Sequence, residues 1–416
     1  MGPIALFDKS FVQSLSVDES VWFDHLFLSI ICPIFYVETL ADLGKSFGEG
    51  KNPDKGVSII SDKVPEMHSN PCMHHKELCL SNLFKHPVPM SGQIPLAGGY
   101  PVKVDGHSGI VFKQTPEAKA FSRWQDQQFY ELERDFARQW RESVSQFNLK
   151  GTAQRLKEVG LDSTGCRSLD EVAKLSKSFI DARGSDFRKI SLLCSFQGFG
   201  RKEREGVLAK WRRSGCQPLR TYAPYAAWVL EVDLFFYYSL QASLISTERP
   251  SNRVDIAYLY YLPFAHVFVS SDKLHRNCAQ ALWKNGSFVW GVDLKAELKT
   301  INDHFSSMSI EERERGVMSI QNGPPDLTGS LVVSLWDKWV PLWRQFNESR
   351  RPSPKDNSNL VKQFNCIANA PPLCGREASE VMREYASMTL QRVVSAKKGS
   401  WWQLPKDVVR GNRGGV

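Results

Sequence analysis

The chain has 416 residues, which is enough for two or three domains and a sizeable buried core. Hydrophobic residues make up 42% of the sequence and charged residues 24%, which excludes a disordered or fibrous protein. The formal net charge is +8, a mild excess for a nucleic-acid-binding protein, but the positive charge is unevenly placed along the chain.

The sequence argues against a membrane protein and against a secreted one. The longest apolar run, residues 21–37, is interrupted by Asp24, His25 and Pro33 and is too broken to cross a bilayer. The N-terminus lacks the basic segment, apolar stretch and cleavage site of a secretory signal. The nine cysteines are scattered and odd in number, unlike a disulfide framework. We therefore expect a cytoplasmic protein with free thiols and no membrane partner.

The first forty residues predict two strands, each followed by a carboxylate. The apolar runs at 4–7 and 30–37 are typical of buried parallel strands, and residues 17–29 between them are typical of a helix. Asp8 follows the first run directly, and Glu38 follows the second and opens a helical stretch that ends near residue 43. Both carboxylates are therefore expected just beyond the carboxyl end of a strand.

The middle of the chain lacks this regular alternation. Residues 44–116 are rich in Gly, Pro, Ser and Asn and predict loops, apart from a hairpin at 100–112 with Asp105-Gly106 as its turn. The apolar spacing over 117–148 predicts one long amphipathic helix. Shorter helices are expected within 152–183 and 202–213.

Alternation resumes after residue 222. The pattern predicts helices at 223–246, 253–262 and 273–283, and strands at 265–269 and 287–292. Asp255 lies near the start of the middle helix, and Asp272 follows the first of these strands. The remainder of the chain, 296–416, is expected to be mostly helical.

Alternating strands and helices favour an α/β fold, a parallel sheet flanked by helices, with the site beyond the carboxyl ends of the strands. Four carboxylates at that edge would repel one another, and Mg²⁺ or Mn²⁺ would relieve the repulsion because both prefer oxygen ligands. Such ions lower the pKa of a bound water and stabilise charge on a phosphate, which suits phosphodiester hydrolysis. Ser10, Ser270 and Ser271 would support the carboxylates or the phosphate.

These residues resemble the acidic motifs of PIN-domain nucleases. Residues 4–10 look like the opening strand and its Asp-x-Ser motif, and residues 31–43 with Glu38 look like the second acidic motif. The stretch 253–272 is similar to the third and fourth motifs, in which a helix starting near an Asp leads into a strand ending in Ser-x-Asp. The likeness covers about a third of the chain.

The resemblance implies a PIN-like core made of residues 1–44 and 223–295, with an insertion at 45–222 and a helical C-terminal region at 296–416. It also implies a Mg²⁺- or Mn²⁺-dependent ribonuclease, a hydrolase acting on RNA or, as the lesser choice, on single-stranded DNA. The implied catalytic residues and metal ligands are Asp8, Glu38, Asp255 and Asp272.

A basic segment offers a surface for such a substrate. Residues 183–220 hold ten Lys or Arg against three acidic residues, a net charge of +7. The residues expected to bind the phosphate backbone are Arg201, Lys202, Arg204, Lys210, Arg212 and Arg213. Trp211 and Phe199 lie among them and are expected to stack on bases. The alternative is a solvated helix face with ion pairs between residues four apart.

Other interpretations remain open. Asp8, Glu38 and Asp272 could each act as a helix cap. An inactive PIN-like protein that binds nucleic acid or serves as a scaffold would keep the same acids, and a protein partner or a second copy is also possible. The third possibility is a zinc module, whose ligands would be His68, Cys72, His74, His75 and Cys79. Their spacing matches no established structural zinc site, so we expect no zinc there.

Overall fold

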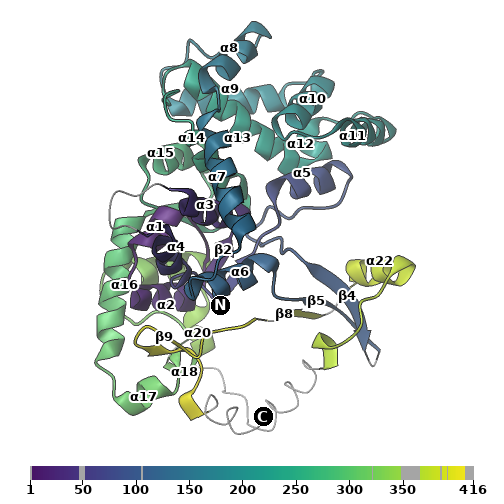
Figure 1. Cartoon of the computed structure of the whole chain (residues 1–416). Helices are drawn as coiled ribbons and strands as arrows, with labels where there is room; N and C mark the ends of the chain where they lie inside the picture. The colour runs from purple at the N-terminus through teal and green to yellow at the C-terminus, as the bar shows by residue number, and fades with distance from the viewer. Residues whose placement is uncertain are drawn as a thin grey trace.

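The computed structural model describes residues 2–45, 52–104, 106–320, 322–347, 366–384, 387–390 and 392–407. Its centre is a five-stranded sheet in which every pairing is parallel. Helices flank this sheet, as Figure 1 shows. The predicted α/β class with a parallel sheet between helices is confirmed.

The strands lie in the order β3-β2-β1-β6-β7. Their bounds are β1 (Ile4–Phe7), β2 (Leu28–Ile31), β3 (Ser69–Pro71), β6 (Val267–Ser270) and β7 (Ser287–Trp290). All four residues of β1 are buried, as expected for a central strand covered on both faces. The chain runs from β1 outward to β3 and returns on the other side of β1. The topological switch therefore lies between β1 and β6, where sheets of this kind bind their ligands.

The predicted second strand at 30–37 is wrong in its extent. The strand ends at Ile31, and α3 (Pro33–Ala41) begins at Pro33. Proline favours the first helical position because its fixed φ suits the helix and its missing N–H costs nothing there. Glu38 consequently lies within α3 rather than at the end of a strand.

The region 44–116 contains more regular structure than predicted. It includes α4 (Pro53–Ser61), the edge strand β3, and α5 (His75–Leu83). The predicted hairpin is present as β4 (Gly99–Val104) and β5 (His107–Phe112). Gly106 in its turn has φ +79°, which favours glycine; Asp105 lies outside the described residues.

The described part of the C-terminal region also contains strands, so the expectation of a mostly helical region was incomplete. β8 (Ser387–Leu390) extends the hairpin sheet by pairing parallel to β5. β9 (Lys397–Lys398) and β10 (Trp401–Trp402) form a small antiparallel pair. The Pro-rich break at 352–354 lies outside the described residues.

A helical layer packs around α13 (Pro224–Gln241), which Figure 1 shows above the sheet. The helix is apolar on nearly all sides and is buried by its neighbours. These neighbours are α5, α8 (Leu149–Glu158), α9 (Leu169–Asp181), α10 (Asp186–Phe196) and α12 (Leu219–Tyr222). Most of this layer lies between β3 and α13 in the sequence, and its core is continuous with that of the sheet.

The single helix predicted over 117–148 is two helices, α6 (Pro116–Gln125) and α7 (Glu131–Ser145). The break includes Gln127, whose φ of +55° lies in the left-handed region and is incompatible with a continuing helix. The break lets α7 leave the direction of α6 and pack against α3.

The remaining elements complete the chain. They are α1 (Lys9–Ser14), α2 (Val17–Leu26), η1 (Asp42–Gly44), α11 (Arg201–Arg213), α14 (Asn252–Asp255), η2 (Ile256–Phe264), α15 (Lys273–Leu282), α16 (Gly291–Ser306), α17 (Ile310–Glu314), α18 (Val317–Ile320), α19 (Leu331–Trp339), α20 (Trp343–Asn347) and α22 (Gly375–Glu384). Among the described residues, no helix is both long enough and apolar enough to cross a bilayer.

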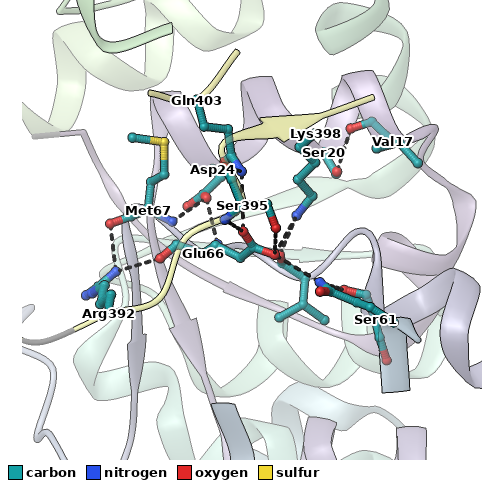
Figure 2. A network of polar contacts seen from close by, with 12 residues as sticks. Val17, Ser20, Asp24, Ser61, Glu66, Met67, Arg392, Ser395, Lys398 and Gln403 are labelled. Carbon is teal, nitrogen blue, oxygen red and sulfur yellow. Dashed lines mark hydrogen bonds and ion pairs between the residues drawn. The ribbon is translucent and has the colours of Figure 1, made fainter. Parts of the chain in front are cut away.

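A polar network ties the edge strand β3 to α2 and to the end of the chain (Figure 2). The buried carboxylate of Asp24 on α2 accepts hydrogen bonds from the backbone N–H groups of Glu66, Met67 and His68 at 2.7, 2.7 and 2.8 Å. Arg392 donates to the backbone oxygens of Met67 and Glu66 at 2.7 and 3.3 Å. Residues 66–68 are therefore held from both sides.

We predict that Asp24→Ala lowers the free energy of unfolding by about 3 kcal/mol, because three backbone N–H groups lose their only side-chain acceptor. Asp24→Asn keeps one acceptor oxygen and should cost less. Urea unfolding measures both, with the exposed Asp303→Ala on α16 as a control expected to stay within about 0.5 kcal/mol of the wild type. A loss no larger than that of the control would contradict the prediction.

Candidate carboxylate site

The four predicted carboxylates come from four separate segments around the switch point of the sheet. Asp8 follows β1 directly, and Asp272 lies just beyond the end of the neighbouring strand β6. Asp255 ends α14, and Glu38 projects from α3. Asp8, Glu38 and Asp272 all lie near enough to Asp255 for their charges to raise the pKa of its carboxyl.

Asp8 is buried, and its carboxylate is fully engaged. Its Oδ1 accepts the backbone N–H of Phe11 at 2.9 Å, so Asp8 caps α1. Its Oδ2 accepts the hydroxyls of Ser10 and Ser270, both at 2.7 Å, and lies 3.3 Å from Nδ1 of His275. Burial raises the pKa of Asp8, but these contacts, led by His275, outweigh it and hold the pKa below its usual value.

His275 on α15 is a buried cation within this acidic cluster. Its Nε2 lies 2.9 Å from the backbone oxygen of Asp255, which can only accept, so Nε2 carries a proton. Its Nδ1 lies 2.9 Å from Oγ of Ser270, whose own proton goes to Asp8, so Nδ1 also carries one. Burial lowers the pKa of His275, but the hydrogen bond and the charge of Asp8 outweigh it and raise the pKa to about 9.

Glu38, Asp255 and Asp272 are half-buried and less constrained than Asp8. The carboxylate of Asp255 accepts no hydrogen bond in the part of the chain that the structure describes, and burial together with the neighbouring carboxylates raises its pKa to about 7. Burial also raises the pKa of Glu38, and Lys9 and the hydroxyl of Tyr258, 2.5 Å away, offset this only in part. Negative charge therefore gathers at this edge of the sheet, and His275 and Lys9 offset it only in part.

The capping interpretation holds for two of the four acids. Besides Asp8, Asp272 caps α15 by accepting the backbone N–H of Leu274 at 2.6 Å. Neither Glu38 nor Asp255 makes a side-chain cap in the described structure. Capping thus accounts for Asp8 and Asp272 but not for the two half-buried acids Glu38 and Asp255.

The donor chemistry of the half-buried acids fits a hard divalent cation, because such ions prefer several carboxylate oxygens with water completing the shell. Glu38, Asp255 and Asp272 are the residues that would hold it. Among the described residues, however, no three His, Cys, Asp or Glu side chains are already grouped as a ligand set. Binding would require these side chains to move toward one another, while Asp8 is tied down by His275.

The three serines differ in their roles. Ser270 is satisfied on every side, because its Oγ also accepts the backbone N–H of Asp272 at 2.9 Å. Ser10 holds Asp8 from α1. The Oγ of Ser271 is buried without a hydrogen-bond partner in the described residues, beside Gly291 at the end of β7.

A cavity of about 530 Å³ adjoins the acids, and Glu38 is on its wall. It also has Lys9, Lys45, Trp140 and Arg141 on its walls, none of which the sequence analysis selected. The sequence could have indicated Lys9 and His275 as neighbours of the site, because each lies on a helix within three residues of a predicted acid. The sequence gives no such indication for Arg141, because it lies on α7, about a hundred residues from any predicted acid.

The basic segment lies away from the acids. Figure 1 shows α11 at the far edge of the helical layer from α15. Trp211 and Phe199 are buried rather than available for stacking, and Lys189 and Arg220 of the same segment form internal ion pairs with Asp186 and with Asp181 and Glu231. Most of the exposed cations of the segment are on α11, where Arg201 pairs with Glu205; Arg183 and Arg188 are exposed outside that helix. The stacking expectation was therefore wrong, and the surface is smaller than predicted.

The His and Cys residues at 68–79 are dispersed over several elements. His68 precedes β3, Cys72 follows it, and His74 caps α5 by accepting the backbone N–H of Lys76. Cys72 and Cys79 are buried, and burial raises the pKa of both thiols well above the usual value. A thiolate, the form that binds zinc, is therefore disfavoured at both.

No protein-family model, curated protein or solved structure matches the chain. The likeness to PIN-domain nucleases therefore rests on the sequence motifs alone.

We predict that the metal-free protein becomes less stable as the pH rises from about 5 to 8. The pKa of Asp255 near 7 exceeds its value of about 3.9 in the unfolded chain, so the folded state holds an extra proton that is lost over this range. His275 acts in the same direction: its contribution is complete below about pH 6.5 and is lost as the pH passes 9.

Asp255→Asn should therefore raise the free energy of unfolding by about 2 kcal/mol at pH 8, after allowance for solvent screening, and change it little at pH 4. Urea unfolding in EDTA across this range measures the effect, with Asp303→Asn as the control. Parallel pH profiles for wild type and Asp255→Asn would contradict the prediction.

Proposed function

We propose that the chain is a PIN-like, metal-dependent ribonuclease, cytoplasmic, with its catalytic acids at the switch point of the parallel sheet. The observation that carries this proposal is that carboxylates from four separate segments gather beside β1 and β6, and that Asp255 and Glu38 cap no helix in the described structure. The PIN-like core would be residues 1–44 and 223–295, interrupted by the insertion at 45–222. The choice of RNA over single-stranded DNA comes from the family resemblance.

The divalent ion, Mg²⁺ or Mn²⁺, would supply an activated water and charge stabilisation on the phosphate. Glu38, Asp255 and Asp272 would hold it. Asp8 and His275 would act as positioning residues, because together they link the end of β1 to α15 and to the backbone of Asp255. The hydroxyl of Tyr258 would orient Glu38.

A second candidate function is binding of nucleic acid without cleavage. It is favoured by the ion pair between Asp8 and His275, which places a protein cation where an active site would leave the first acid free for metal. The two functions separate in a single comparison, since only the first requires a metal-dependent activity.

We predict that Mn²⁺ raises the melting temperature of the wild type, because an ion that binds only the folded state adds stability, about 2.7 kcal/mol at a hundredfold excess over Kd. Asp255→Asn and Glu38→Gln should each remove RNA cleavage and shrink this shift while leaving the metal-free fold intact, since neither residue caps a helix in the described structure. These variants test the metal site more specifically than Asp8→Asn does, because Asp8→Asn would also disturb the N-cap of α1.

The measurements are thermal melts and cleavage of a labelled RNA, each with and without Mn²⁺, with Asp303→Asn as the control. A wild type that is indifferent to Mn²⁺ in both would exclude the nuclease. If it also bound RNA, the second function would stand.

We predict that exposed cations of α11 contribute to RNA affinity through the phosphate backbone. Replacing Arg201, Lys202, Arg212 and Arg213 with Ala should weaken binding at every sequence and flatten the salt dependence by about 0.7 units of slope per lost contact. Fluorescence anisotropy over a salt series measures the slope, and Lys119→Ala with Lys299→Ala, both exposed and off α11, is the control. An unchanged slope would identify α11 as a solvated face.

A further inference from the structure

The cavity beside Glu38 is formed jointly by the sheet core and the inserted segment. Part of its wall comes from α3, from η1 with Lys45 after it, and from the start of α1, and the rest comes from α7 and residues 250–254. Its volume of about 530 Å³ falls within the range of roughly 300–1,000 Å³ typical of small-ligand sites. Because Glu38 is on its wall, whatever fills the cavity lies beside the carboxylate site.

The cavity wall carries more positive than negative charge. Lys9 and Lys45 share a single carboxylate, that of Asp42, at 2.9 and 2.6 Å. Arg141 is exposed and forms no ion pair with any described residue. Its guanidinium is thus free to bind an anion, and its planar fork suits a phosphate.

An apolar surface lies next to this cation. Trp140 and Val144 of α7 contribute to the cavity wall, as does Val254. The ring of Phe136 stacks on Trp140, with centroids 6.1 Å apart and planes 19° apart, which helps fix the orientation of the indole. A half-exposed indole beside a free guanidinium is the pair of groups that binds a base and its phosphate.

The form of nucleic acid follows from this pair. Within a duplex the faces of the bases are covered by their neighbours, so a base must be unstacked before an aromatic side chain can contact its face. The cavity therefore favours single strands, in which bases are free to leave the stack.

We propose that this cavity is a nucleotide subsite in which Arg141 binds a phosphate and Trp140 stacks on a base of single-stranded nucleic acid, adjacent to the carboxylate site. The subsite rests on the proposed function for its position relative to the cleaved bond. In this proposal the insertion helps to select the substrate, because its helix α7 contacts the single-stranded nucleic acid.

The test measures binding of a labelled single-stranded oligouridine to the full chain in EDTA, and its cleavage in Mn²⁺. Trp140→Ala should weaken binding about tenfold or more, in line with the usual effect of removing a stacked aromatic. Arg141→Ala should weaken binding and reduce the salt slope by about 0.7, the value for one phosphate on a single strand. Arg141→Lys should restore most of the slope.

Matched controls come from the same helix. Arg138→Ala removes an exposed arginine of α7, and Leu132→Ala removes an exposed apolar side chain of the same helix; neither residue lines the cavity. Both should bind like the wild type. A blunt-ended RNA duplex of the same length should bind with an affinity that does not change in Trp140→Ala.

The outcomes separate this inference from the proposed function. If Trp140→Ala and Arg141→Ala bind and cleave like the wild type while Asp255→Asn abolishes cleavage, the subsite is excluded and the nuclease stands. If wild type binds but does not cleave, and both substitutions weaken binding, the subsite stands without the nuclease. Equal losses in the variants and their α7 controls would also exclude the subsite, because they would report a disturbed helix.

Discussion

The contact between Asp8 and His275 is the constraint on which the switch point of the sheet depends. It joins the end of β1 to α15, and Ser270 brings the end of β6 into the same cluster. An isolated carboxylate at a buried position would be costly, so its cation and three hydrogen-bond donors are needed to keep it ionised there. Once Asp8 is held, the positions of α1 and of the loop after β6 follow, and so do the positions of Glu38 and Asp255 around it.

The same constraint divides the acids into two pairs. Asp8 and Asp272 accept backbone N–H groups at helix starts, and their geometry is set by folding. Glu38 and Asp255 cap no helix in the described structure, and burial raises the pKa of each carboxyl above its usual value. Acids whose pKa is raised by burial and by neighbouring charges, and which cap no helix, are typical of functional sites. The argument for a bound cation at this edge therefore rests mainly on Glu38 and Asp255, the two acids that cap no helix in the described structure.

The sequence predicts those elements that are encoded by short residue patterns, and it does not predict contacts that arise only from packing between distant segments. Short apolar runs predict β1, the strand β6 before Asp272, and the helix α13. The alternation of strands and helices along the chain predicts the parallel sheet. Pro33 was a visible signal that the second strand ends early, and it was outweighed by the β-branched and aromatic residues after it. β3 escaped prediction because its three residues become a strand only by pairing with β2. Arg141 and Trp140 meet Glu38 through packing alone, which no local pattern encodes.

The network around Glu66 has a consequence for how the protein is made. Lys398 donates to the backbone oxygen of Val64, 334 residues earlier in the chain, at 2.7 Å, and Arg392 reaches the same region. On the ribosome, an early segment emerges long before the residues that hold it. Until then the backbone oxygens of Val64 and Met67 lack these side-chain donors. This network therefore forms only after residues 392–398 have left the ribosome, so the 64–67 segment must first pack without the contacts that later fix it.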